Sequence, residues 1–301
     1  MVVRERRAPG RRALRGRGYR RGVTSSPPPP AHPAARPRLI ATDLDGTLLG
    51  DGGAVSARNA AALRRAADAG AGVVLVTGRS QHRLGKVYSQ LGARYLAICA
   101  NGGVVYDPAG ERVLACRPMP PAHVRRVCAL LRERVPEVVF AAHVECGGRV
   151  LHEPGWPRNR KAADAPPPTV LPDVTGGPVV KLQARAPGRE PESFVALVAA
   201  TVGDLVEVTR QGYLGLVEMS RRGVTKGSAL AAVAGELAIP AADVLVFGDM
   251  PNDVPMMLWA GRSVAVANAH AEVRAAATDV TLANVEDGVG VYLERLLDGR
   301  A

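Results

Sequence analysis

Cysteine and long apolar runs are scarce in this chain of 301 residues, and both absences narrow its class. Its four cysteines, Cys99, Cys116, Cys128 and Cys146, form no CxxC pair, and a chain this long needs no disulfide framework. We therefore expect reduced thiols and a cytoplasmic location. No apolar run approaches the roughly 18 residues needed to span a bilayer, so we expect a soluble protein with no membrane partner. A hydrophobic content of 47% excludes a wholly disordered chain.

Acidic residues are nearly missing from residues 1–38, which hold eleven arginines and only Glu5. The net charge of +11 arises mainly there, because residues 39–301 hold 28 basic and 27 acidic residues. Residues 1–26 lack the apolar stretch of a secretory signal. We expect residues 1–37 to be a disordered, Pro-rich and functionally minor tail. Non-specific nucleic-acid binding by its arginines is the alternative, although Tyr19 alone offers no stacking surface and we expect no specific nucleic-acid partner.

The body of the chain alternates apolar strands with helical stretches. Gly72–Val76 and Val244–Phe247 are continuous apolar runs, which is typical of parallel strands buried on both faces. Ser56 and Thr225 are good N-cap residues for the helices that we expect to follow them. Strands at 38–42, 95–99 and 263–266 complete the pattern. This alternation predicts an α/β fold with a doubly wound parallel sheet.

Between residues 104 and 213 the pattern changes. Short strands are expected at 113–116, 138–142, 150–152, 179–183 and 205–209, with helical stretches near 121–134 and 190–202. This mixture predicts an α+β domain inserted into the first. We therefore expect a catalytic core from residues 38–103 and 214–301 and an inserted domain at 104–213.

Carboxylates follow two of the expected strands. Asp43 and Asp45 come after the first strand, and Asp249 and Asp253 come after Val244–Phe247. In a doubly wound sheet ligands bind beyond the carboxyl ends of the strands, so these side chains should converge. Asp43 and Asp45 alone are also consistent with an ordinary turn. Together, several carboxylates in one crevice would repel each other without a cation, and hard oxygen ligands favour Mg²⁺.

Other residues at the strand ends suit an anionic substrate. Thr77 and Gly78 offer a hydroxyl and backbone N–H groups at a strand-to-helix turn, where anions bind. Lys226 lies at the expected start of a helix, where its charge opposes the macrodipole. We interpret it as a counter-charge for phosphate, although an isolated lysine is more often solvated surface. Arg79 and Asn101 are further candidates for substrate binding at the mouth of the site.

Four segments carry a resemblance to a known family. They are RLIATDLDGTLL (38–49), VVLVTGRS (73–80), EMSRRGVTKGSAL (218–230) and VLVFGDMPNDVPMM (244–257). Their order is that of the four motifs of the haloacid dehalogenase (HAD) superfamily, and residues 38–301 resemble its Cof-type, class IIB-capped phosphatases. ANGG (100–103) resembles the stretch that precedes the cap in that branch.

The resemblance implies catalytic roles for the acidic residues. Asp43 would be the nucleophile that forms an aspartyl-phosphate, and Asp45 would be the general acid and base. Mg²⁺ would be held by Asp43, the backbone carbonyl of Asp45, and Asp249. Asp253 would complete the metal site through a water molecule or orient Lys226.

It also implies a substrate class. Thr77 and Lys226 would bind the transferring phosphoryl group, with Asn252 close by, and residues 104–213 would form a cap over the site. The expected enzyme is a Mg²⁺-dependent phosphoric monoester hydrolase that acts on a small phosphorylated metabolite, of the sugar-phosphate or flavin-pathway type. A phosphomutase of the same superfamily is the alternative. The oligomeric state is left open.

Overall fold

The computed structural model describes residues 36–157, 171, 177–211 and 215–299. Residues 1–35 of the expected basic tail lie outside these residues, as does the Pro-rich stretch at 165–172 apart from Leu171. Among the described helices none is both long and apolar enough to cross a bilayer.

The described chain forms thirteen strands and eight α-helices. The strands are β1 (Leu39–Asp43), β2 (Gly72–Val76), β3 (Leu96–Cys99), β4 (Val104–Asp107), β5 (Arg112–Cys116), β6 (Val139–Val144), β7 (Arg149–His152), β8 (Lys181–Arg185), β9 (Val206–Gln211), β10 (Leu216–Arg221), β11 (Val244–Gly248), β12 (Arg262–Ala265) and β13 (Asp279–Val280). The α-helices are α1 (Ala57–Asp68), α2 (Gly85–Leu91), α3 (Pro121–Arg134), α4 (Pro191–Val202), α5 (Lys226–Glu236), α6 (Val254–Trp259), α7 (Ala271–Ala276) and α8 (Gly288–Leu297). Three short 3₁₀ turns matter below, namely η3 (Ala100–Gly102), η4 (Glu145–Gly147) and η6 (Pro251–Asp253).

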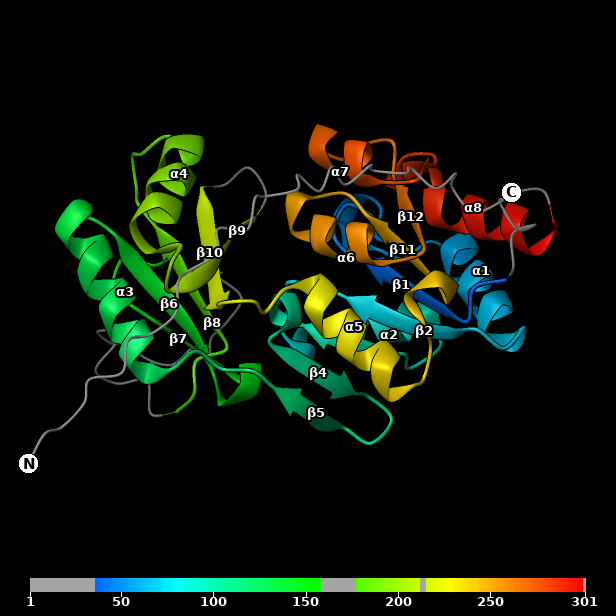
Figure 1. Cartoon of the computed structure of the whole chain (residues 1–301), viewed down its shortest axis with the longest axis horizontal. Helices are drawn as coiled ribbons and strands as arrows, with labels where there is room; N and C mark the ends of the chain where they lie inside the picture. Colours follow the sequence, from blue (N-terminus) through cyan, green and yellow to red (C-terminus); the bar gives the residue numbers. More distant parts are fainter. Residues whose placement is uncertain (1–35, 158–170, 172–176, 212–214, 300–301) are drawn as a thin grey trace, which may run out of the picture. The chain divides into compact units, whose positions relative to one another are not determined.

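The larger sheet has the order β13-β12-β11-β1-β2-β3-β4-β5. Figure 1 labels β12, β11, β1, β2, β4 and β5 of this sheet. Neighbouring strands from β13 to β3 run parallel, and β4 and β5 add an antiparallel hairpin at the β3 edge. Every residue of β1 and β11 is buried, so both faces of the sheet centre are covered. This architecture confirms the predicted α/β fold with a doubly wound parallel sheet.

The smaller sheet is antiparallel, with the order β7-β6-β8-β10-β9. Helices α3 and α4 contact each other and supply apolar side chains to one core with the sheet. On β8 and β10, apolar residues that join this core alternate with polar ones: Leu182 and Val217 belong to the core, whereas Lys181 and Glu218 do not. The period of two places the polar residues on the face away from α3 and α4.

Strand pairing differs from the boundaries expected for the inserted domain at 104 and 213. Strands β4 and β5 belong to the larger sheet, and β10 belongs to the smaller one. Short strands carry no signal of which sheet they join, because pairing is set by partners far away in the chain. We keep the two-domain division as a proposal, with the cap drawn from α3 to β10.

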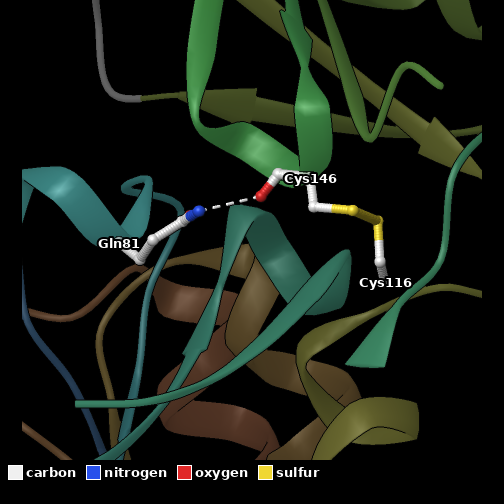
Figure 2. Close-up of a disulfide and its surroundings, with 3 residues drawn as sticks. All are labelled: Gln81, Cys116 and Cys146. Carbon is white, nitrogen blue, oxygen red and sulfur yellow. Dashed lines mark hydrogen bonds between the residues drawn. A yellow bond between two sulfur atoms is a disulfide. The ribbon is translucent and has the colours of Figure 1, made fainter. Parts of the chain in front are cut away.

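A disulfide between Cys116 and Cys146 contradicts the expectation that all thiols are reduced. It joins the end of β5 in the larger sheet to η4, between β6 and β7 of the smaller sheet, with Cα atoms 5.7 Å apart (Figure 2). The Gln81 side-chain amide donates a hydrogen bond to the Cys146 carbonyl at 2.9 Å in the same place. Thirty residues separate the two cysteines, so no local spacing signals the bond. Because disulfides are uncommon in reducing compartments, one basis for the expected cytoplasmic location is lost.

Candidate active site

A buried ion-pair cluster lies at the carboxyl end of β1. Asp43 is the last residue of this strand, and its Oδ1 accepts a hydrogen bond of 2.7 Å from Lys226 Nζ. The same ammonium donates to Asp253 Oδ1 at 2.6 Å. All three side chains are at least nine-tenths buried. The ammonium group therefore links two carboxylates that come from different parts of the chain.

Helix α5 places this lysine. Thr225 is its N-cap, and the Thr225 hydroxyl accepts a hydrogen bond from the backbone N–H of Ser228 at 3.0 Å, while the Ser228 hydroxyl accepts one from the Thr225 N–H. The predicted N-cap of the helix, Thr225, is thus confirmed, and Lys226 is the first helical residue. A cation at this end opposes the helix dipole, and the two carboxylates offset that cost.

A second group of carboxylate contacts follows β11. Asp253, the last residue of η6, accepts hydrogen bonds from the backbone N–H groups of Asp249 and Met250 at 3.0 Å each. The Thr47 hydroxyl donates to Asp249 Oδ1 at 2.9 Å. Oxygen atoms from Asp43, Asp249 and Asp253 all lie within 4.8 Å of one another. Three buried carboxylates thus face a single ammonium group.

The pKa values reflect an excess of negative over positive charge in the cluster. Burial raises the pKa of Asp43 well above its ordinary value, Lys226 opposes this rise, and Asp253 and Asp249 add to it. Burial and the charge of Asp253 raise the pKa of Asp249 to about 6. Burial tends to lower the pKa of Lys226, but Asp253 and Asp43 outweigh it and the pKa is raised. The protein itself supplies too little positive charge for its carboxylates, so an added divalent cation would suit the site.

Close backbone packing brings the β1 loop to this cluster. Gly46 has a φ of 84°, and a Cβ atom at this position would lie 2.3 Å from Asp249 Oδ2. Only glycine combines this backbone conformation with so near an approach. Gly46 therefore allows the DLDG turn and Asp249 to lie together.

Asp45 and Arg79 form an ion pair at the wall of the site. Arg79 Nε donates to Asp45 Oδ2 at 2.8 Å, and a terminal guanidinium nitrogen contacts the other carboxylate oxygen. The Asp45 side chain is 57% exposed, and it is not among the three carboxylates that cluster. Its side chain thus faces Arg79, which the sequence analysis placed at the mouth of the site, and this pairing with the expected general acid and base was not predicted.

Thr77 and Gly78 follow β2. The buried Thr77 Oγ1 accepts a hydrogen bond from the Arg79 backbone N–H at 3.0 Å, which shapes this turn. The carbonyl of Gly78 accepts one from Lys181 Nζ at 2.8 Å. Asn101, in η3, is buried with a φ of 55°, and its backbone N–H donates to the Thr77 carbonyl at 3.1 Å. The loops after β2 and β3 are thereby joined beside Asp43.

A cavity of about 340 Å³ brings most of these residues together. It is lined by Asp43, Asp45, Gly78, Arg79, Arg210, Glu218, Lys226, Asp249, Met250 and Asn252. Three of the predicted site residues do not line the cavity but form hydrogen bonds with residues that do: Thr77 with Arg79, Asp253 with Lys226, and Asn101 with Asn252. Sequence reasoning missed Arg210 and Glu218, which come from β9 and β10 of the smaller sheet. The one available signal was an acidic residue, Glu218, between apolar neighbours and eight residues before Lys226.

The comparisons with known proteins agree on a family of hydrolases that includes phosphatases. A family model described as haloacid dehalogenase-like hydrolase matches residues 40–293. Phosphatase YwpJ of Bacillus subtilis (strain 168) is 31% identical over 285 residues, which cover 86% of this chain and 100% of that protein. Pyridoxal phosphate phosphatase YbhA of Escherichia coli (strain K12) is 29% identical, over 85% of this chain and 97% of that protein.

A solved structure of a HAD subclass IIB sugar phosphatase is similar in fold. It superimposes with a TM-score of 0.72 over 86% of this chain and 98% of that one, at 21% identity. At this identity the likeness concerns the fold alone.

Proposed function

Because this chain belongs to the haloacid dehalogenase-like hydrolases and is a phosphatase of that family, we propose that it hydrolyses a small phosphate monoester with Mg²⁺ through an aspartyl-phosphate on Asp43. This family is the one that the resemblance of the four sequence motifs implied. The observation that carries the proposal is the pair of hydrogen bonds from Lys226 to Asp43 and Asp253 beside a cavity. A buried carboxylate held by an ammonium group at the wall of a cavity is an oriented nucleophile, with a positive charge ready for the phosphoryl oxygens.

The residues present fit a magnesium ion. Asp43 and Asp249 offer carboxylate oxygens, and the backbone carbonyl of Asp45 is the further ligand that we propose. Both oxygens of Asp253 already accept hydrogen bonds, from Lys226 and from two backbone N–H groups, so we assign it to the orientation of Lys226. When bound, Mg²⁺ neutralises charge on the phosphoryl oxygens during transfer.

The proposed reaction has two steps. In the first, an oxygen of Asp43 attacks phosphorus and the bond to the ester oxygen breaks. Asp45, which has to be protonated and released from Arg79 for this step, gives its proton to the leaving alcohol. In the second, Asp45 takes a proton from a water molecule that attacks the aspartyl-phosphate. Inorganic phosphate leaves, and Asp43 is restored. Division into two steps replaces one difficult displacement with two easier ones.

Substrate binding is assigned to the groups around the nucleophile. We propose that Lys226, Thr77 and the backbone of Gly78 bind the phosphoryl group, with Asn252 beside them. Arg79, already next to Asp45, would bind near the leaving group. The substrate is proposed to be of the sugar-phosphate or flavin-pathway type, small enough for the cavity of about 340 Å³.

The test is phosphate release from a panel of phosphorylated metabolites in the presence of Mg²⁺, with no bisphosphate activator. The panel contains sugar phosphates, flavin-pathway phosphates, pyridoxal phosphate and p-nitrophenyl phosphate. We expect hydrolysis by the wild type and none by Asp43→Asn, whose melting temperature should stay near that of the wild type. Undiminished turnover by Asp43→Asn would overturn the mechanism. Phosphoryl transfer back to a sugar phosphate, without net release, would favour the mutase.

A further inference from the structure

The smaller sheet carries a buried polar face. On the side away from α3 and α4 lie His143 of β6, Lys181 and Gln183 of β8, and Glu218 of β10, each less than a tenth exposed. Cross-strand register sets His143 opposite Lys181 and Gln183 opposite Glu218. A sheet face that is both polar and buried must satisfy its hydrogen bonds locally, and it does so against the loops of the candidate active site.

Lys181 and Glu218 form an ion pair at the centre of this face. Lys181 Nζ donates to Glu218 Oε1 at 2.6 Å, and each side chain is 3% exposed. The Gln183 amide also donates to Oε1, at 2.8 Å. A buried ion pair is weak evidence for stability, because desolvation of the two charges offsets most of their attraction. The contacts that the pair makes with its surroundings are therefore more informative.

Both members contact loops of the catalytic site. Lys181 donates to the carbonyl of Gly78 at 2.8 Å, and the Asn101 amide nitrogen donates to Glu218 Oε2 at 2.7 Å. The same amide nitrogen donates to the Thr209 hydroxyl at 3.3 Å, so both of its hydrogens are used. The loops after β2 and β3 are thus held by one pair from the other sheet.

The contact with Asn101 fixes the direction of a second amide. An ionised carboxylate only accepts hydrogen bonds, so the Asn101 nitrogen must face Glu218 and its oxygen must face away. That oxygen accepts a hydrogen bond from the Asn252 amide nitrogen at 3.2 Å. Asn252 Oδ1 is then left buried, with no hydrogen-bond partner among the described residues. An unpaired buried oxygen is costly, so the groups around Asn252 do not by themselves favour this orientation of its side-chain amide.

We propose that Glu218, held by Lys181, is a positioning residue that orients Asn101 and through it Asn252, which lines the cavity beside Asp43. In this orientation the Asn252 nitrogen, with one hydrogen engaged by Asn101, keeps its second hydrogen for a phosphoryl oxygen. This inference rests on the proposed phosphatase function. It follows that the smaller sheet, through Glu218, determines which way the side-chain amide of Asn252 points beside the larger sheet.

The first variant is Glu218→Gln, which keeps the side-chain volume but can present either a donor or an acceptor to Asn101. We expect kcat/KM for p-nitrophenyl phosphate to fall about 10-fold or more, and inhibition by inorganic phosphate to weaken by a similar factor. Glu218→Gln combined with Lys181→Met removes the lysine left without its ion pair. We expect this double variant to melt near the wild type and yet to be as slow as the single variant.

Ser220→Ala is the matched control. Ser220 lies on the same face of β10, two residues from Glu218, is buried, and donates to the Val224 carbonyl. Its kinetics should equal those of the wild type. Wild-type kinetics in the double variant, or an equal loss in Ser220→Ala, would overturn the positioning role.

A readout that needs no turnover separates this inference from the proposed function. The side-chain amide ¹H–¹⁵N signals of Asn101 and Asn252 are assigned by their loss in Asn101→Asp and Asn252→Asp. In Glu218→Gln both signals should move. Movement of the Asn101 signal alone contradicts the inference even if the enzyme is active. Movement of both signals in a protein that hydrolyses no ester supports the inference and rejects the proposed function.

Discussion

Lys226 Nζ lies 2.7 Å from Asp43 Oδ1, and these two residues are 183 positions apart in the chain. The contact joins the first residue of a helix to the last residue of the central strand. Because both groups are buried, neither charge is well screened by water, and each depends on the other. The geometry thus ties the orientation of the proposed nucleophile to one lysine.

Replacement of this lysine should therefore remove most of the activity. We expect Lys226→Met to lower kcat/KM for p-nitrophenyl phosphate by about 10²–10³-fold, since it removes the charge that would bind the phosphoryl group and orient Asp43. Lys86→Met is the matched control, because Lys86 is exposed on α2. Turnover by Lys226→Met within threefold of the wild type would contradict the assigned role.

Metal binding should be visible in stability. Burial and Asp253 raise the pKa of Asp249 to about 6, so its ionised form destabilises the metal-free fold above that pH. At pH 8 we expect Asp249→Asn to melt at or above the wild type without metal. Saturating Mg²⁺, at about 100 times its Kd, should stabilise the wild type by about 2.7 kcal/mol and the variant by much less.

Asp243→Asn is the control for metal binding. Asp243 pairs with Arg38 at the surface, 3.6 Å away, so this variant should keep the full response to Mg²⁺. Differential scanning fluorimetry with and without EDTA measures all three proteins. An equal Mg²⁺ response in Asp249→Asn would place the metal elsewhere.

The core of the fold was predictable because its signals are local. Gly72–Val76 is a strand with the predicted bounds, since a parallel strand covered on both faces is an unbroken apolar run. Thr225 caps α5 as predicted, because the capping preference depends on residues within one turn. The same strand pattern placed the acidic residues after two of the strands, and the order of the four motifs then implied their catalytic roles.

Long-range polar contacts could not be predicted in the same way. Strand β10 has Glu218 among apolar residues, and the lysine that pairs with it lies 37 positions earlier in the chain. Whether an acid in such a strand is buried depends on which loop covers it, and the pattern of one strand does not contain that information. The disulfide was missed for the same reason, since Cys116 and Cys146 meet only when the two sheets are assembled.

Loss of the disulfide should lower stability substantially. Cys116 and Cys146 close a loop of about 30 residues, for which the chain-entropy account gives about 3–4 kcal/mol. We expect Cys116→Ser to lower the free energy of unfolding in urea by this amount. A reductant should lower the wild type similarly and leave the variant unchanged. A wild type that is insensitive to reductant, with no loss in Cys116→Ser, would show that the bond contributes nothing.

His143 should make stability fall in acid. Burial lowers the pKa of His143 well below its ordinary value, and the charge of Lys181 lowers it further. The folded protein therefore holds this ring neutral, hydrogen-bonded between Ser80 Oγ at 2.8 Å and Gln183 Oε1 at 3.2 Å. The unfolded chain takes up a proton near pH 6.5, so protons favour unfolding below that pH.

The expected signature is a difference between the wild type and His143→Gln. The contribution of the neutral ring is fully present above about pH 6.5 and is lost as pH falls below it, by up to about 1.4 kcal/mol per pH unit. Urea unfolding at pH 8 fixes the difference between the two proteins when the ring is neutral in both states. From pH 6.5 to 5 the wild type should lose stability faster than the variant, because only the wild type can gain a proton at this position on unfolding. Parallel curves over this range would mean that His143 is protonated equally in both states, and the neutral ring inferred from its burial between Ser80 and Gln183 would then be wrong.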